Sequence, residues 1–313
     1  MTAGRLLLGR ALQSLLILWL VSLLAFALLA LAPGDPARLL LAAAGGEPPT
    51  PAEVAAKRAE LRLDDPLALR YLAWLGGALR GDFGQSYRSA RPAWELYAER
   101  LPATLLLAGV ALALTLVVAV PLGVIAAARR GGLLDGLLQM VAVVGTAAPG
   151  FWVALVLLLV FAATLRWLPA LGSPTPAGVI LPAVVLALPN IAVIARLVRA
   201  STLDALGQAY ITTARGKGHS WRGALLFHAL PNAMVGILTA VALELAYLLT
   251  GTVVVETVFA YPGVGRLAVE AALVRDLPVL TLCVLAAAVI YLLCNWLGDL
   301  GMVLLDPRIR YTV

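Results

Sequence analysis

The sequence predicts an all-α membrane protein with six transmembrane helices, and two observations support this fold class. Of the 313 residues, 62% are hydrophobic and only 13% are charged, whereas a soluble domain is about 45–50% apolar and about 25% charged. The apolar residues also fall in continuous runs of about 20 residues, which is the length that a helix needs to cross a bilayer. A water-soluble core has no room for this much apolar surface.

Six apolar runs are long enough to span the membrane with some tilt. The first run follows Arg5 and Arg10 and ends near a sequence that resembles a signal-peptidase site, but it exceeds the roughly 7–15 apolar residues of a signal peptide, so we expect an uncleaved anchor. Internal prolines such as Pro149, Pro182 and Pro189 are expected to kink their helices. The predicted spans are residues 11–31, 103–128, 137–163, 178–199, 233–255 and 279–305.

The basic residues predict the orientation of the chain in the membrane. Eleven Lys and Arg residues lie in the two termini, in the segment after the second span, and in the segment that begins at the end of the fourth span and follows it. Three lie in the short loops on the other side. Cytoplasmic loops carry the excess of Lys and Arg, so we expect both termini in the cytoplasm. This orientation explains the net charge of +6 better than nucleic-acid binding, which requires a solvated basic patch.

The expected organisation has four parts. Residues 1–32 hold the N-terminal segment and the first span, residues 33–101 form an extracytoplasmic helical loop, residues 102–305 form the membrane core, and residues 306–313 form a cytoplasmic tail. Within the outer loop, Thr50-Pro51-Ala52-Glu53 has the pattern of a capping box. Asp65-Pro66 marks the start of a further helix, and we expect this loop to pack as a lid on the membrane domain.

The sequence lacks the common motifs of nucleotide-binding and membrane-enzyme sites. It has no G-x-x-x-x-G-K-[ST], H-E-x-x-H or G-x-S-x-G motif, so we expect no catalytic residue, no metal ligand and no cofactor bound by this chain. Cys283 and Cys294 are eleven residues apart, about 16 Å along a straight helix, which is too far for a disulfide. We expect both to be buried, inert thiols.

Two carboxylates lie inside predicted spans and are functional candidates, because a charge in the bilayer is costly. Glu244 lies midway along the fifth span. It either lines a solute pathway or is protonated and hydrogen-bonded to a neighbouring helix. Asp299 lies near the inner end of the sixth span and is expected to pair with an arginine of a loop.

A long basic loop at residues 200–232 separates the fourth and fifth spans, where a short turn would be enough to connect them. Residues 208–215 have helical spacing, and the glycines that follow are expected to end this helix. Ser220 is expected to cap a second helix that reaches Leu230, where Pro231 bends the chain into the next span. We expect a short cytoplasmic helix that lies parallel to the membrane. It either fits a groove on a partner protein or lies on anionic membrane lipid.

The loop resembles the coupling loop of the permease subunits of binding-protein-dependent ABC importers. That loop is written E-A-A-x-x-x-G-x9-I-x-L-P, and here Ala214, Gly218 and Leu230-Pro231 have the matching spacing, while Thr212 replaces the Glu and His228 the Ile. Tyr210 and the run from Ala214 to Gly218 resemble the peptide/nickel branch of the family. Further similar segments cover nearly the whole chain: LAPGDPA (31–37), LDDPLALRY (63–71), GDFGQSY (81–87), LPATLLL (101–107), VVVETVFAYPGVGRL (253–267) and LLDPRIR (304–310).

The resemblance implies a type I ABC importer permease in a bacterial inner membrane, without enzymatic activity of its own. The implied partners are a homologous second permease subunit, two cytoplasmic ATPase subunits that bind ATP and Mg, and an extracytoplasmic solute-binding protein. The implied solutes are dipeptides, oligopeptides, or nickel and metal chelates. The alternatives to a permease subunit are a stand-alone secondary carrier and a membrane scaffold. The residues assigned to ATPase coupling are Tyr210, Thr213, Ala214, Arg215, Lys217, Gly218 and His228, with Ala214 and Gly218 as close-packing positions and Glu244 as a candidate pathway residue.

Overall fold

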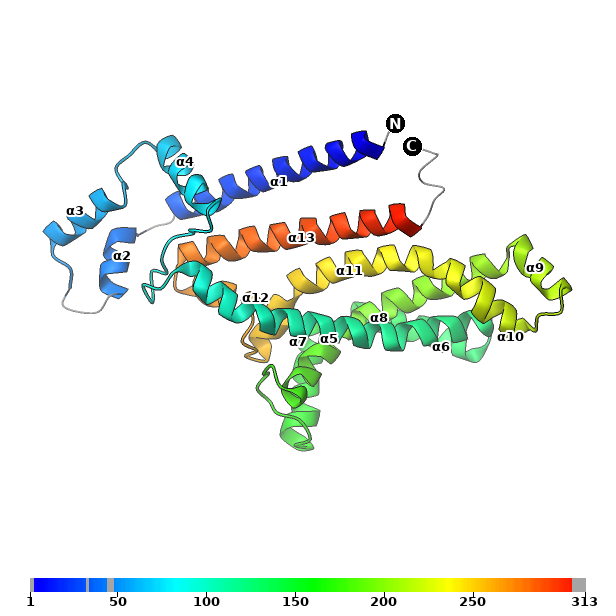
Figure 1. Cartoon of the computed structure of the whole chain (residues 1–313). Helices are drawn as coiled ribbons and strands as arrows, with labels where there is room; N and C mark the ends of the chain where they lie inside the picture. Colours follow the sequence, from blue (N-terminus) through cyan, green and yellow to red (C-terminus); the bar gives the residue numbers. More distant parts are fainter. Residues whose placement is uncertain (1–2, 32–33, 44–47, 306–313) are drawn as a thin grey trace. The chain divides into compact units, whose positions relative to one another are not determined.

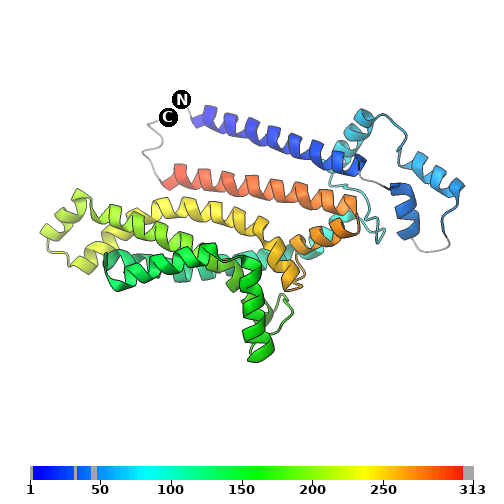
Figure 2. The same cartoon turned by 180° about the vertical axis from the view of Figure 1, so that it is seen from behind.

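The computed structural model describes residues 3–31, 34–43 and 48–305, which form helices joined by turns (Figures 1 and 2). Within these residues there is no β-strand, only an isolated bridge between Gln85 and Pro92, so the all-α prediction is confirmed. The α-helices are α1 (Ala3–Leu31), α2 (Pro36–Ala43), α3 (Pro51–Glu60), α4 (Leu67–Ala78), α5 (Ala93–Ala128), α6 (Leu133–Ala147), α7 (Gly150–Leu157), α8 (Pro176–Leu206), α9 (Ala209–Gly216), α10 (Trp221–Ala224), α11 (Leu230–Val258), α12 (Val264–Leu273) and α13 (Leu277–Leu305). Two π-helical segments are η1 (Leu158–Thr164) and η2 (Leu225–Ala229).

Among the described residues, four helical stretches are long and apolar enough to cross a membrane. They are Gly9–Leu28, Ala93–Ala128, Pro176–Leu206 and Leu277–Gly298, and they correspond to the first, second, fourth and sixth predicted spans. The fifth predicted span lies within α11, a single helix of 29 residues. The structure therefore confirms an apolar helical protein with several candidate spans but does not confirm the number six.

The prediction of one continuous third span over residues 137–163 is wrong. The helix is interrupted after Ala147, and α7 begins at Gly150. Pro149 has an extended backbone, with φ −61° and ψ 128°. The helix stops before it because proline has no N–H to donate and disfavours helix at the residue before it. The segment formed by α7 and η1 leaves α6 at a steep angle (Figures 1 and 2), so the proline ends the helix here rather than kinking it.

The described helices belong to two compact units. The first, called the 105–261 unit, comprises Leu105–Tyr261 with the described residues 3 and 291–305. The second, called the 4–104 unit, comprises Gly4–Thr104 and Pro262–Ile290.

In the 105–261 unit, α8 packs against α6 on one side and α11 on the other. Its core is formed largely by alanine and branched aliphatic side chains, and small residues allow membrane helices to approach closely. A Cβ atom added to Gly123 of α5 would lie 2.6 Å from the Ala195 carbonyl oxygen and 2.6 Å from Val198 Cβ. Helix α5 therefore touches the backbone of α8 at this glycine. The buried core residues are Ala119, Ile194, Ala195, Val198, Ala205, Ile211, Ala224, Leu225, Ala229, Ala233 and Ile237.

In the 4–104 unit, the predicted capping box is present at the start of α3. The Glu53 N–H donates to Thr50 Oγ1 over 3.3 Å, and the Thr50 N–H donates to Glu53 Oε2 over 2.7 Å. Helix α4 begins at Leu67, directly after Pro66, but no side chain caps it.

Both cysteines are buried and form no disulfide, as predicted.

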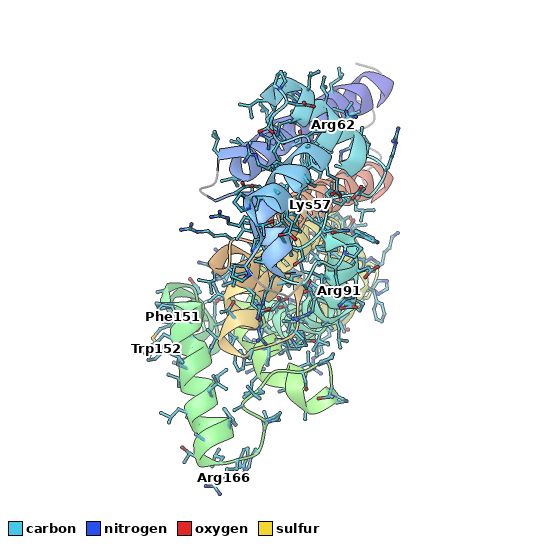
Figure 3. The ribbon with its side chains drawn as sticks, turned by 90° about the vertical axis from the view of Figure 1, so that its left-hand side faces the viewer. Lys57, Arg62, Arg91, Phe151, Trp152 and Arg166 are labelled. Carbon is cyan, nitrogen blue, oxygen red and sulfur yellow. The ribbon has the colours of Figure 1, made fainter. Side chains whose placement is uncertain are left out.

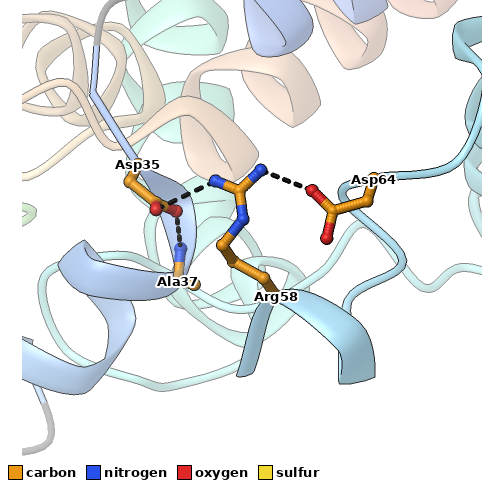
Figure 4. Close-up of polar contacts among 4 residues, drawn as sticks. All are labelled: Asp35, Ala37, Arg58 and Asp64. Atoms are coloured by element: carbon orange, nitrogen blue, oxygen red, sulfur yellow. Dashed lines mark hydrogen bonds and ion pairs between the residues drawn. The ribbon is translucent and has the colours of Figure 1, made fainter. Parts of the chain in front are cut away.

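An ion-pair cluster in the 4–104 unit joins α3 to the segments on either side of it (Figure 4). The Arg58 guanidinium donates to Asp35 over 3.0 Å and to Asp64 over 2.6 Å. Asp35 also accepts the Ala37 N–H over 3.0 Å at the start of α2. Arg58 thus connects α2, α3 and the turn that follows α3.

We predict that Gly123→Ala destabilises the protein, because the new methyl group overlaps the α8 backbone. Overpacking of this kind costs about 1–3 kcal/mol and should lower the thermal unfolding midpoint in detergent. The matched control is Gly109→Ala in the same helix, where a Cβ atom meets nothing within 4 Å. Equal unfolding midpoints for the two variants would contradict the close approach of α5 and α8.

Candidate functional site: the loop between α8 and α11

Helix α9 ends in a complete Schellman motif, a standard C-terminal cap in which the last carbonyl groups receive backbone hydrogen bonds. The Gly218 N–H donates to the Arg215 carbonyl over 3.0 Å, and the His219 N–H donates to the Ala214 carbonyl over 3.2 Å. Gly218 has φ +93°, a conformation that glycine adopts without strain. The prediction that a glycine ends this helix is confirmed for Gly218, while Gly216 is the last residue of α9 itself.

One face of α9 is buried in the 105–261 unit. Ile211 and Ala214 are 5% and 6% exposed, and Ile211 belongs to the same core as residues of α8, η2 and α11. The small side chain of Ala214 therefore serves packing within this chain, although the sequence suggested that it admits a partner. The predicted coupling residues on the exposed surface are Tyr210, Thr213, Arg215, Lys217 and Gly218.

The connection from α10 to α11 is helical throughout but widens into the π-helical segment η2. Ser220 caps α10 as predicted, since the Gly223 N–H donates to Ser220 Oγ over 3.1 Å. Pro231 has no N–H to continue the α-helical pattern. The Leu230 N–H reaches back five residues to the Leu225 carbonyl, and the Asn232 side chain donates to the His228 carbonyl over 2.7 Å. The proline thus produces a π-turn, a feature that is frequent at functional sites, and not the predicted bend.

His228 lies in this π-turn and contacts His219, the only other histidine of the sequence. The two ring centroids are 4.9 Å apart, with an interplanar angle of 80°. Nε2 of His228 is buried and has no hydrogen-bond partner among the described residues. The sequence spacing of nine residues did not predict this contact, because it depends on the turn at Gly218.

An ion pair that the sequence did not predict holds the C-terminal part of α8. Arg199 donates from Nε to Asp135 Oδ1 over 2.5 Å and from Nη2 to Oδ2 over 2.7 Å. The Gly131 N–H adds a bond of 3.0 Å to Oδ2, and the carboxylate is almost fully buried. The hydrogen bonds from Arg199 and then Gly131 hold the pKa of Asp135 well below its usual range. This bidentate pair joins α6 to the helix that leads into α9.

The structure does not bring Glu244 together with the coupling residues. Glu244 is partly buried in α11, 16 residues after His228, which corresponds to roughly 24 Å of helix. The Asp299 side chain, for which we predicted a loop arginine as partner, lies outside the described side chains. The site therefore consists of α9, its C-terminal cap and the π-turn.

Comparison with known proteins identifies the class to which this fold and loop belong. Residues 119–311 match the family described as "Binding-protein-dependent transport system inner membrane component", and residues 3–108 match the N-terminal part of such membrane components. The chain is thus an inner-membrane permease subunit of an ABC transporter. It belongs to the family of binding-protein-dependent transport system inner membrane components, which work with ATPase and binding-protein partners and have no enzymatic activity of their own.

Several bacterial proteins are similar to this chain over nearly its full length. A probable peptide ABC transporter permease of Sinorhizobium fredii is 39% identical, covering 98% of this chain and 100% of that protein. An oligopeptide transport system permease of Bacillus subtilis is 36% identical, covering 96% of this chain and 98% of that protein. A chain of the methionine ABC transporter MetNI in an inward-facing crystal form has a TM-score of 0.57 at 18% identity, over 67% of this chain and 96% of that chain. This last similarity supports the importer permease fold.

We predict that Gly218→Ala loosens the end of α9. A side chain at φ +93° is strained by about 1–2 kcal/mol, which corresponds to about 5- to 30-fold faster hydrogen exchange of the capping amides. Gly216→Ala is the matched control, because its Cβ atom also meets nothing within 4 Å but its backbone is helical, where alanine is favoured. Unchanged exchange in Gly218→Ala would contradict the capping role.

We also predict an acid-sensitive contribution of Asp135 to stability. Because the pKa of Asp135 is lowered in the folded protein, its carboxylate stabilises the fold above the ordinary aspartate pKa of about 3.9, and this contribution is lost as the pH falls below it. Asp135→Asn should lower the thermal unfolding midpoint at pH 7. As the pH is lowered from about 5 to 3, the midpoint of this variant should fall less than that of the unmodified protein. The control is Asp204→Asn, at an exposed position of α8. The same pH profile in both variants would contradict the prediction.

Proposed function

We propose that the chain forms half of the translocation pathway of an ATP-driven importer for small peptides. The full-length similarity to proteins named as peptide and oligopeptide permeases supports this solute class. In this proposal a homologous second permease subunit supplies the other half of the pathway, and an extracytoplasmic binding protein delivers the peptide. Both termini and the loop between α8 and α11 face the cytoplasm.

The observation that carries the proposal is the geometry of α9. Its buried face shares a core with α8, η2 and α11, and its end is fixed by the Gly218 cap. Its other face presents exposed Tyr210, Thr213 and Arg215. A helix that is rigidly attached on one side and exposed on the other can transmit a push from a partner to the membrane helices.

Two cytoplasmic ATPase subunits are the proposed partners on this face, one on each permease. ATP and Mg would bind to those subunits, and we expect this chain to bind no cofactor. Closure of the ATPase pair would move α9, and with it α8 and α11, so that the pathway changes its accessible side. A stand-alone secondary carrier would transport without these partners, which separates it from the proposal.

We predict that Thr213→Trp weakens ATPase docking, because it adds bulk to the exposed face of α9 without touching its buried face or its cap. Peptide uptake by the four subunits reconstituted together with the binding protein should fall by about tenfold or more, since a misfit at an interface centre costs about 2 kcal/mol. The control is Asp204→Trp, an equally bulky change at an exposed position of α8. Uptake and ATPase co-purification that are unchanged in Thr213→Trp would contradict the coupling role.

The solute is tested on the binding protein that works with this permease. Submillimolar binding of di- to pentapeptides, with uptake that requires ATP, is the expected result. Nickel and metal chelates are the alternative solutes, because the sequence of the loop at residues 47–66 resembles nickel-type permeases somewhat more than oligopeptide permeases. Binding of a nickel chelate but of no peptide would replace the proposed solute while leaving the ATP coupling in place.

A further inference from the structure

The 4–104 unit contains a cavity of about 640 Å³ that lies apart from the coupling loop in sequence. Its walls come from α1, α2, α3, α4, the turn after α3, the segment at residues 82–87 and the start of α13. This volume lies within the range of roughly 300–1,000 Å³ of small-molecule sites. The cavity is therefore large enough to enclose a short peptide.

One part of the cavity wall is aromatic. Phe26 and Trp74 contact each other with ring centroids 5.7 Å apart. Tyr87 also lines the cavity, and burial, together with the charge of Asp276, raises its pKa to about 12. The Tyr87 phenol therefore stays neutral at physiological pH and can donate a hydrogen bond to a ligand.

The remaining wall carries charges of both signs, some of which have partners. Lys57 pairs with Glu60 over 2.8 Å, and Asp82 accepts the Gly84 N–H over 2.9 Å. In contrast, no hydrogen bond or ion pair connects the side chains of Arg62, Arg70 or Asp65 to any of the described residues. Two guanidinium groups and one carboxylate are thus available to a ligand in the cavity.

Arg62 is also held in an unusual backbone conformation. It has φ +50° at the C-terminal cap of α3, where the Arg62 N–H donates to the Ala59 carbonyl and the Leu63 N–H to the Arg58 carbonyl. Glycine is the residue that usually occupies this position of a Schellman motif, and strained residues cluster at binding sites. Arg62 is labelled in Figure 3, and its side chain is exposed. An arginine at this position is therefore explained better by its guanidinium group than by its effect on the helix end.

We propose that this cavity is a binding site for short peptides with free termini. Arg62 and Arg70 would bind the α-carboxylate, since guanidinium groups match carboxylate geometry. Asp65 would bind the α-ammonium group, and an apolar side chain would pack against Phe26 and Trp74. The choice of peptides rests on the proposed function, while the requirement for both charges follows from the cavity itself.

The test is calorimetric titration of the purified full chain in lipid nanodiscs with the dipeptide Ala-Phe. We expect saturable binding that weakens at least tenfold when the peptide is C-amidated, and also when it is N-acetylated. Arg70→Gln and Arg62→Gln should each weaken binding at least tenfold, with partial recovery in Arg70→Lys. The control is Arg80→Gln, an exposed arginine of the same segment that does not line the cavity.

Absence of binding, or equal binding of the free and the amidated dipeptide to the unmodified protein, would overturn the proposal. The comparison of ligands needs no variant, so it decides the question even if a substitution impairs folding. Uptake of Ala-Phe by the complete transporter, with no binding to the isolated chain, would contradict this site and leave the proposed function standing. Binding to the chain without uptake would contradict the proposed function and leave the site standing.

Discussion

The structure of the loop between α8 and α11 depends on the burial of one face of α9. A helix of eight residues has little stability by itself in water, because short helices are marginal without tertiary contacts. Ile211 supplies such a contact, since it shares a core with α8, η2 and α11, and the Schellman cap at Gly218 fixes the helix end. Without this burial, the exposed residues of α9 would have no fixed position on the surface, and a partner could not push the membrane helices through them.

Two further features hold the helices on which α9 rests. The ion pair between Arg199 and the buried Asp135 connects α6 to α8 before the chain enters the loop, and its strength comes from two parallel charge-assisted bonds. The π-turn before Pro231 lets the chain enter α11 without a break. The loop is thus continuous with rigid elements on both sides, which is the property that mechanical transmission requires.

The sequence predicted those features that depend on neighbouring residues. The capping box at Thr50, the Ser220 cap and the glycine end of α9 each follow from a few adjacent side chains, and the structure has all three. The sequence did not predict the pair of Asp135 and Arg199, which are 64 residues apart. It predicted that Pro149 kinks its helix, whereas the helix ends there, because tertiary packing decides between these outcomes.

The burial of Ala214 could not be predicted from the sequence either. A small residue on an amphipathic helix is compatible with packing against a partner or against its own chain, and only the fold shows that the second applies here. The contact between His219 and His228 likewise exists only because the turn at Gly218 folds the chain back. The sequence therefore could not predict which face of each helix packs within the chain, because that depends on contacts between residues far apart in the sequence.

The central claim is that α9 and α11 move as one rigid body, and a spin-label distance tests it most directly. Labels would be placed at Thr212 of α9 and Val254 of α11, both exposed, after replacement of the native cysteines and assembly with the ATPase partners. The account predicts one narrow distance distribution that is the same without nucleotide and with ATP bound. A distribution that shifts or broadens on ATP binding would show that α9 moves independently of α11 and would contradict the account.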